Sequence, residues 1–358
     1  TAEPARPAEL SQERQANTSK QVIPNASQIL SQNVTPEPPD AATQAAMLER
    51  FKNISIVYTW VNSSSPHHNN LMMQAGRQPR FSACPEDEHL RFSLRALERY
   101  MPWHQGSVYL VTPGYWPHWL NEVHPRLIRM EQTVLVPEPY PILNSNALEL
   151  NLDRIPSLTD QFIHMNDDYI LMKPCHPWDL FTATGAVKLF FKNQTMTRET
   201  LNRRRVWRHA TSYTWSLVDA AYGEQPRWYL KHSPFVYHKR VFGLIKKKWP
   251  RETNQTYTRF RDPDNVIPPI LHHAFVLHEG QQHNLTGSLL PHATMESEHV
   301  FIPFKSLKLQ ESLNKLSSEV KFLTVNGNCG NVAGNTRILV DWLLKRYPVP
   351  SSFEKPAD

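Results

Sequence analysis

The pattern of apolar positions predicts strands that alternate with helices from residue 54 onward. Runs of β-branched and aromatic residues predict strands at residues 54–61, 107–112, 126–130, 162–165, 187–191 and 321–325. Apolar residues at helical spacing predict helices at residues 90–101, 147–155 and 336–346, and residues 198–250 are expected to be mainly helical. This alternation predicts an α/β fold, Rossmann-like, with a mostly parallel central sheet flanked by helices and a largely helical insertion.

The first 48 residues follow a different pattern. They are rich in Pro, Ala, Gln, Ser and Thr and have no sustained apolar period. We expect residues 1–48 to form a flexible stem, in which only the Ala-rich stretch 41–51 favours a helix. Residues 49–358 are then expected to form a single domain.

The composition and charge of the chain exclude several classes of protein. Of the 358 residues 40% are hydrophobic, enough for a sizeable core, which excludes a wholly disordered chain. The net charge of +6 is spread thinly, so we expect no nucleic-acid partner and favour an anionic, phosphate-bearing substrate. Neither G-x-G-x-x-G nor a P-loop motif occurs, which counts against dinucleotide and P-loop proteins. Three cysteines, Cys84, Cys175 and Cys329, permit at most one internal disulfide.

Glycosylation sequons indicate a compartment. The Asn-x-Ser/Thr pattern marks a glycan acceptor only in a secreted or lumenal protein. It occurs at Asn17, Asn25, Asn33, Asn53, Asn62, Asn193, Asn254 and Asn284. The chain begins with Thr1 and contains no run of about 18 apolar residues. We expect a lumenal protein of the secretory pathway, in the Golgi, of type II topology, whose membrane anchor is absent from this chain; the alternative is that the sequons occur by chance, which would supply roughly a third of them.

The residues 166–168 are the first candidate site. Asp167 and Asp168 directly follow an apolar strand and come after Asn166. Ligands of open α/β sheets bind at the carboxyl ends of strands, where two carboxylates suit Mg²⁺ or Mn²⁺. The alternative is a simple turn that ends the strand, because Asn and Asp favour turns. The residue pattern leaves both interpretations open.

Three further groups of charged or titratable residues are candidates. Asp262 and Asp264 form a D-x-D pattern typical of metal sites in nucleotide-sugar enzymes, although a loop is the simpler interpretation. Arg91 and Arg95 lie four residues apart, so they either meet one anionic group or remain exposed cations. His232 is a candidate base provided that it reaches the site.

A set of motifs resembles the Stealth family of sugar-phosphate transferases. This family includes the alpha/beta subunits of animal N-acetylglucosamine-1-phosphotransferase and capsular-polysaccharide phosphotransferases of microbes. The motifs occur in order: VYTWVN at 57–62, LRFSLRALE at 90–98, NSNALE at 144–149, FIHMNDD at 162–168, HSP at 232–234, RDPDN at 261–265, NGN at 326–328 and YPVPSSFE at 347–354. Two departures matter: Ser55, Ser63 and Ser65 replace residues of the opening block, and Gly327 replaces an Asp.

The resemblance implies a reaction. Such a catalytic domain moves a sugar-1-phosphate from a UDP- or GDP-sugar to a hydroxyl of an acceptor glycan and releases the nucleoside monophosphate. The resemblance also implies a Mg²⁺ or Mn²⁺ cofactor. It is compatible with a homodimer, and it implies membrane contact only through the missing anchor. A conventional glycosyltransferase that transfers the sugar alone, and a non-catalytic glycan-binding homologue, are the alternatives.

The resemblance implies residue roles as well. The implied catalytic residues are Asp168, His232 and Arg261. The implied substrate-binding residues are Tyr58, Trp60, Asn62, Arg91, Arg95, Ser145 and Asn146. The implied metal ligands are Asp167, Asp168, Asn326 and Asn328.

Overall fold

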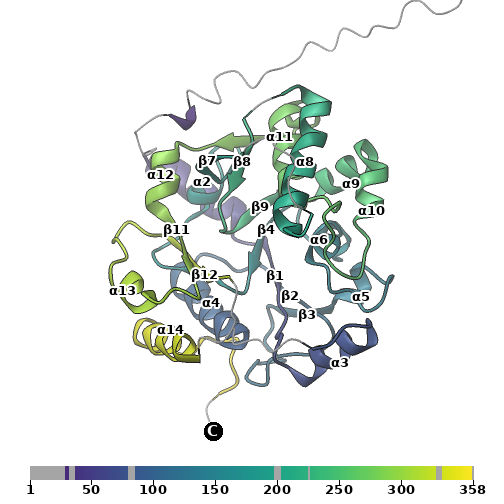
Figure 1. Ribbon diagram of the computed structural model, residues 1–358. Helices are drawn as coiled ribbons and strands as arrows, with labels where there is room; N and C mark the ends of the chain where they lie inside the picture. Colours follow the sequence, from purple (N-terminus) through teal and green to yellow (C-terminus); the bar gives the residue numbers. More distant parts are fainter. Residues whose placement is uncertain are drawn as a thin grey trace, which may run out of the picture.

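The computed structural model of the chain describes residues 29–31, 37–79, 85–196, 203–224, 226–327 and 333–356. Figure 1 shows helices arranged around strands, with the C-terminal helix and the strands β11 and β12 on one side and helices α8 to α11 on the other. Within this described part, no helix combines the length and apolar character needed to cross a membrane.

The central sheet has five strands in the order β3-β2-β1-β4-β9. They span Leu127–Glu131, Val108–Thr112, Ser55–Thr59, Gln161–Asn166 and Phe235–His238. Neighbouring strands are parallel except for β9, which pairs antiparallel with β4. The strands that follow β1 in the chain continue to either side of it, so β1 and β4 form a topological switch point of the kind that binds ligands.

A second sheet of three strands has the order β11-β12-β5. It consists of His299–Pro303, Phe322–Asn326 and Tyr169–Leu171. The turn Asp167-Asp168 links β4 of the central sheet directly to β5 of this one. Two smaller sheets pair β6 (Val187–Leu189) with β10 (Gly287–Leu289) and β7 (Phe191–Thr195) with β8 (Trp228–Leu230).

Helices cover the sheets. Those in the first half of the chain are α2 (Ala41–Phe51), α3 (Pro66–Gln74), α4 (Glu86–Tyr100), α5 (Gln132–Leu135), α6 (Ser145–Glu149), the 3₁₀ helix η1 (Leu152–Arg154) and α7 (Pro177–Leu180). Those in the second half are α8 (Val206–Tyr222), α9 (Lys239–Lys248), α10 (Pro250–Gln255), α11 (Pro268–His278), η2 (Gly280–His283), α12 (His292–Glu298), α13 (Leu309–Asn314) and α14 (Ala333–Arg346).

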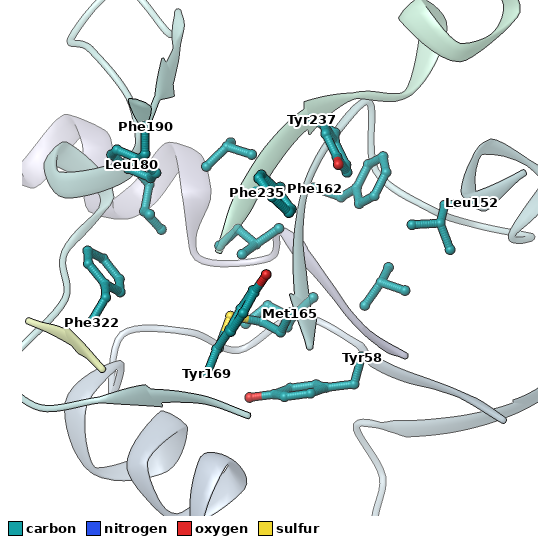
Figure 2. Close-up of a cluster of buried hydrophobic side chains, with 14 of the residues drawn as sticks. Tyr58, Leu152, Phe162, Met165, Tyr169, Leu180, Phe190, Phe235, Tyr237 and Phe322 are labelled. Carbon is teal, nitrogen blue, oxygen red and sulfur yellow. The ribbon is translucent and has the colours of Figure 1, made fainter. Parts of the chain in front are cut away.

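The core is aromatic and continuous across the elements. Figure 2 shows part of it, where Tyr58 of β1, Phe162 of β4 and Tyr237 of β9 lie among other buried rings. The rings of Phe162 and Tyr237 make an edge contact with centroids 5.5 Å apart. Because β1 and β4 are buried on both faces, their sequences read as apolar runs rather than as an alternation.

The predicted α/β class with a mostly parallel central sheet is confirmed. Residues 198–250 are mainly helical as predicted, through α8 and α9, but β8 and β9 also lie inside this segment and β9 closes one edge of the central sheet. Aromatic and β-branched residues in β9, such as Val236 and Tyr237, favour a strand there. The helix α6 is capped by Asn144, whose side chain accepts from the backbone N–H of Asn146.

The N-terminal helix α2 packs against α7. Met47 and Phe51 are buried, and the Phe51 ring stacks on Phe181 at 4.0 Å. The predicted boundary between residues 48 and 49 therefore falls inside a helix that is docked on the domain. The predicted helix at 41–51 itself is confirmed.

Candidate functional site

A cavity of about 340 Å³ opens where the carboxyl ends of β1 and β4 meet. The parallel register pairs Thr59 with Asn166, so the residues that follow each strand come together at one edge of the sheet. The lining includes Thr59, Trp60, Glu86, His89, Ser145, Asn166, Asp167, Asp168, Arg261 and Asn326. Six separate stretches of the chain therefore contribute polar groups to one cavity.

Asp168 lies at the centre of these polar groups. Its side chain is almost fully buried, and its Oδ2 lies 3.3 Å from Nε2 of His232. The same Oδ2 accepts a hydrogen bond from Nδ2 of Asn326. Burial alone would raise the pKa of Asp168, but the His232 imidazole and the Asn326 amide hold it below its ordinary value. Asp168 is therefore a carboxylate at neutral pH.

Asp167 differs from its neighbour. It is half-buried, and burial together with the negative charge of Asp168 raises its pKa well above the ordinary value. Two adjacent carboxyl groups in one cavity repel each other, and a bound cation would relieve this repulsion.

The residues present provide a partial fit to a divalent cation. Oδ1 of Asp168 is buried and has no hydrogen-bond partner among the described residues, which leaves one carboxylate oxygen for a ligand. Asn326 presents its amide nitrogen to Asp168 and its Oδ1 to the backbone N–H of Gly327, so it must rotate before its oxygen can bind a metal. No cluster of three His, Cys, Asp or Glu side chains forms a metal site within the described ranges. Asn328 and two of the cysteines, Cys84 and Cys329, lie outside those ranges.

Arg261 and Ser145 meet on the wall of the cavity. Nε and Nη2 of Arg261 donate to Oγ of Ser145 at 2.9 and 2.5 Å. A bridge between Leu143 and Phe260 aligns the two segments, and the buried Asn265 accepts from Nδ2 of Asn144 at 2.8 Å. The loop thus presents a guanidinium, a donor suited to phosphate oxygens, to the same cavity as the carboxylates.

A network of polar contacts lies behind this cavity and includes residues that the sequence analysis assigned no role. Nδ1 of the buried His164 lies 3.2 Å from Oε1 of Glu149, and its Nε2 lies 3.1 Å from Oγ1 of Thr59. Tyr237 donates to the same carboxylate at 2.5 Å. Glu149 follows Ser145 by four residues on α6, so helical spacing could have indicated that both face one side.

His89 is a second residue missed by the sequence analysis. It lines the cavity, is buried, and its Nε2 has no hydrogen-bond partner among the described residues. Burial lowers its pKa to about 4, so the imidazole is neutral at pH 7. His89 lies on the face of α4 that meets the cavity. In the sequence only its apolar neighbours show the helical period, so the direction of His89 itself was not evident.

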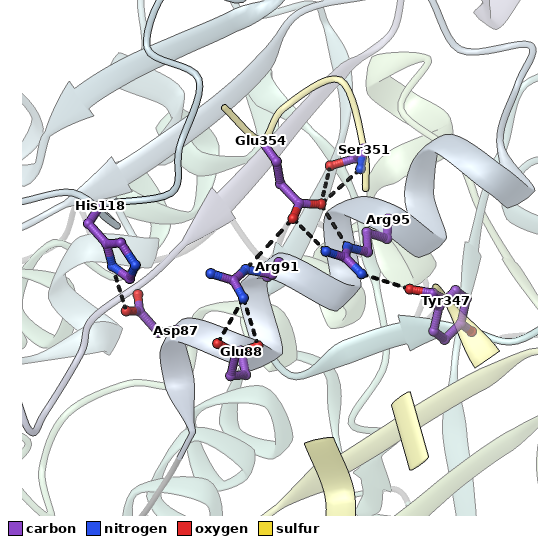
Figure 3. Close-up of polar contacts among 8 residues, drawn as sticks. All are labelled: Asp87, Glu88, Arg91, Arg95, His118, Tyr347, Ser351 and Glu354. Carbon is purple, nitrogen blue, oxygen red and sulfur yellow. Dashed lines mark hydrogen bonds and ion pairs between the residues drawn. The ribbon is translucent and has the colours of Figure 1, made fainter. Parts of the chain in front are cut away.

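Arg91 and Arg95 do not reach the cavity. Figure 3 shows both guanidinium groups turned toward Glu354 of the C-terminal segment. Arg95 binds the two Glu354 oxygens at 2.7 Å each and donates to the carbonyl of Tyr347 at 2.8 Å. Arg91 lies 3.7 Å from Glu354 and also pairs with Glu88. Both arginines do face one anionic group, but that group is the carboxylate of Glu354 in this chain. They cannot reach a substrate in the cavity, because their side of α4 points away from it.

The other predicted binding residues divide into two groups. Trp60 lines the cavity, and Asn62 lines an adjoining groove together with Trp60 and Tyr115. Tyr58 points the opposite way from Thr59, as strand alternation requires, and its hydroxyl meets Ser93 at 3.0 Å in the core. Asn146 is buried in α6 and is absent from the lining of the cavity.

The D-x-D pair forms a loop rather than part of the cavity. Oδ1 of Asp262 accepts from the backbone N–H of Asp264, which closes a local turn. The carboxylate of Asp264 binds the Arg203 guanidinium at 2.7 and 2.8 Å on the surface. The simpler of the two interpretations of this motif is therefore the one that the structure supports.

Comparisons with known proteins agree with these motifs. Residues 83–189 match Stealth protein CR2, conserved region 2, and residues 231–278 match Stealth protein CR3, conserved region 3. An exopolysaccharide phosphotransferase of Streptomyces coelicolor is 28% identical over 320 residues, which are 84% of this chain and 52% of that protein. The exopolysaccharide phosphotransferase CpsY of Mycobacterium tuberculosis is 25% identical, over 85% of this chain and 58% of that protein.

Further similarities extend to a shorter relative and to a solved structure. A capsular polysaccharide phosphotransferase of Actinobacillus pleuropneumoniae is 26% identical over 56% of this chain and 58% of that protein. The crystal structure of galactosyltransferase LgtC with donor and acceptor sugar analogs covers 83% of this chain and 98% of its own, with 10% identity and a TM-score of 0.41. The chain spans about half the length of the curated relatives that it matches most fully.

Proposed function

Because the chain carries conserved regions 2 and 3 of the Stealth proteins, we propose that it transfers a sugar-1-phosphate from a nucleotide-diphosphate sugar to a hydroxyl of an acceptor glycan. The acceptor oxygen attacks the phosphorus that bears the sugar, and the bond from that phosphorus to the oxygen of the nucleoside phosphate breaks. A phosphodiester forms, and the nucleoside monophosphate leaves. The names of the relatives, which are phosphotransferases for exopolysaccharide or capsular polysaccharide, support this reaction class.

One observation carries the proposal: a carboxylate, Asp168, and a guanidinium, Arg261, line one cavity, and His232 contacts that carboxylate at 3.3 Å. His232 takes the proton of the acceptor hydroxyl, and Asp168 orients the imidazole through the 3.3 Å contact. Arg261 neutralises the phosphate oxygens on which charge accumulates, and Ser145 holds the guanidinium in place. Trp60 and Asn62 bind the nucleotide, with the indole available for stacking on the base.

A divalent cation is part of the proposal. Mg²⁺ or Mn²⁺ would be held by Asp168, Asp167 and a rotated Asn326, with the unpartnered Oδ1 of Asp168 as the first ligand. When bound, the ion neutralises and orients the diphosphate of the donor. The chain's own residues then provide the base and the second positive charge.

The test is a screen of UDP- and GDP-sugars with an acceptor polysaccharide, in which the released nucleotide is identified by chromatography. Release of a nucleoside monophosphate is expected; release of a nucleoside diphosphate would show a conventional glycosyltransferase instead. The variant His232→Ala should lose turnover by about 10²- to 10⁴-fold yet bind the donor as the wild type does. Loss of donor binding in that variant, or no turnover of any donor in the wild type with Mg²⁺ or Mn²⁺, would contradict the proposal.

The compartment is also a proposal. Four sequon asparagines, Asn53, Asn193, Asn254 and Asn284, are exposed on the surface, where a glycan could be attached. Asn62 is half-buried beside the cavity, so we expect its sequon to carry no glycan. Exposed acceptors support a lumenal location in the secretory pathway.

A further inference from the structure

A second pocket, of about 560 Å³, lies between helix α7, the strands β6 and β10 and the N-terminal helix α2. Its apolar wall consists of Met47, Phe181, Leu289 and Leu290. Residues 37–39, which precede α2, form part of its rim. The phosphotransfer reaction uses none of the residues that line it.

This pocket has an aromatic platform. His176 and Trp178 both line it, and their rings stack with centroids 4.4 Å apart and planes 15° apart. The indole is half-buried, so it is held in place and still accessible. A stacked pair of rings presents a flat apolar surface on which the C–H face of another ring can pack.

Polar groups surround the platform, and they carry both signs of charge. Nζ of Lys321 pairs with Asp179 at 2.6 Å and lies 3.9 Å from the carboxylate of Glu298, too far for a direct hydrogen bond. Nζ of Lys188 donates to the carbonyl of Trp178. The hydroxyl of Thr294, a residue only 4% exposed, has no hydrogen-bond partner among the residues that the structure describes.

The charged and polar groups around this pocket determine which class of ligand can bind there. An anionic ligand would meet the carboxylates of Asp179 and Glu298, and a cationic ligand would meet the ammonium groups of Lys188 and Lys321. A neutral ring with one apolar face and several hydroxyls satisfies the platform, the unpartnered hydroxyl of Thr294 and the charged donors and acceptors together. A pyranose has this chemistry.

The pocket is separate from the catalytic cavity. Lys321 precedes the first residue of β12, and Asn326 is its last, so the two sites lie at opposite ends of one strand. At about 3.3 Å for each residue the separation is about 16 Å. That distance corresponds to several sugar units along a glycan, not to a second subsite for one sugar.

We infer that this pocket binds a neutral sugar unit of a glycan at a distance from the reacting hydroxyl. The inference rests on the proposed function only for the identity of that glycan as the acceptor. Binding by the pocket itself needs neither a donor nor turnover, so the two proposals can fail separately.

The experiment measures binding of two neutral trisaccharides, maltotriose and tri-N-acetylchitotriose, to the whole chain by ligand-observed NMR titration. We expect at least one to bind, and Trp178→Ala to weaken that binding about tenfold. Thr294→Val keeps the shape of the side chain and removes the hydroxyl, so it should weaken binding about 2- to 12-fold. Trp207→Ala is the matched control, because this half-exposed indole stacks on Tyr229 away from the pocket.

Three outcomes would overturn the inference. Neither trisaccharide binds the wild type; or binding survives both Trp178→Ala and Thr294→Val; or Trp60→Ala abolishes binding that Trp178→Ala leaves unchanged, which would place the sugar in the catalytic cavity. If Trp178→Ala lowers the unfolding midpoint, Thr294→Val decides the result.

Discussion

At the residue scale, Asp168 is held by two neighbours that come from two separate, later segments of the chain. His232 comes from the loop before β9, and Asn326 ends β12. Both act on the same oxygen, Oδ2, and this leaves Oδ1 as the atom that can meet a ligand. The carboxylate is thus charged and oriented, and only one of its two oxygens has hydrogen-bond partners before a ligand binds.

Arg261→Lys is the sharpest test at this scale. The substitution keeps the charge but removes the planar fork, and lysine cannot reproduce the two bonds to Ser145. We expect kcat to fall by about 10²- to 10³-fold, as for the loss of one donor to a developing charge. Arg203→Lys is the control: it lies near the same loop but binds the surface carboxylate of Asp264. Equal activity of both variants would refute a phosphate-binding role for Arg261.

Sequence reasoning predicted the residues that come directly after strands, and missed those whose direction depends on helix rotation. Asp168 follows β4, and parallel strands bring their ends together, so its place followed from pattern and topology. The pair Arg91 and Arg95 shares one face of α4, as predicted, but spacing alone does not show that this face meets Glu354, 259 residues beyond Arg95. Spacing alone likewise does not show that His89, on another side of the same helix, faces the cavity.

At the element scale, α4 is the support shared by the cavity and the C-terminal segment. One side carries His89 toward the cavity, and another side carries Arg95 toward Glu354. The side chains of Arg95 and Glu354 are each 8% exposed. Burial of an ion pair makes it costly to remove one partner, because the other charge is left without compensation.

Glu354→Gln should therefore destabilise the fold. We expect the free energy of unfolding, measured with urea, to fall by about 3–5 kcal/mol, because Arg95 remains buried without its counter-charge. The matched control is Glu311→Gln, since Glu311 pairs with Lys315 on the surface of α13. That change should cost less than about 0.5 kcal/mol. Equal effects of the two substitutions would show that the buried pair does not hold the C-terminal segment.

Long elements were predicted better than short ones. Runs such as 107–112 are long enough to identify a strand, and α14 is long enough to identify a helix. β5 has three residues and β9 four, too few for any period to appear. Both are fixed by pairing with partners distant in the chain, which is information that a local pattern lacks.

At the scale of the whole molecule, buried neutral histidines couple folding to pH. Burial lowers the pKa of His89 and His104 to about 4 and that of His273 to about 3. The unfolded chain takes up these protons near the ordinary value of 6.5, whereas the folded protein does not. The stability that comes from keeping these histidines neutral is therefore fully present above pH 6.5, and it is lost as the pH falls toward 4.

We expect each of these histidines to remove about 2 kcal/mol of unfolding free energy between pH 7 and pH 5. Urea unfolding at a series of pH values measures this slope. His104→Gln should flatten the curve, whereas His118→Gln should leave it unchanged, because the His118 side chain is 82% exposed. A wild-type curve that is flat between pH 7 and pH 5 would show that the buried imidazoles do not control acid stability.

The contact between Asp168 and Asn326 joins residues that are 158 positions apart. Closing so long a loop is slow and costs conformational entropy, and it precedes any gain from the contact itself. A nascent chain whose synthesis has passed the Asp167-Asp168 turn still lacks His232, Arg261 and Asn326. The cavity is thus complete only after residue 326 has been synthesised and these distant segments have folded together.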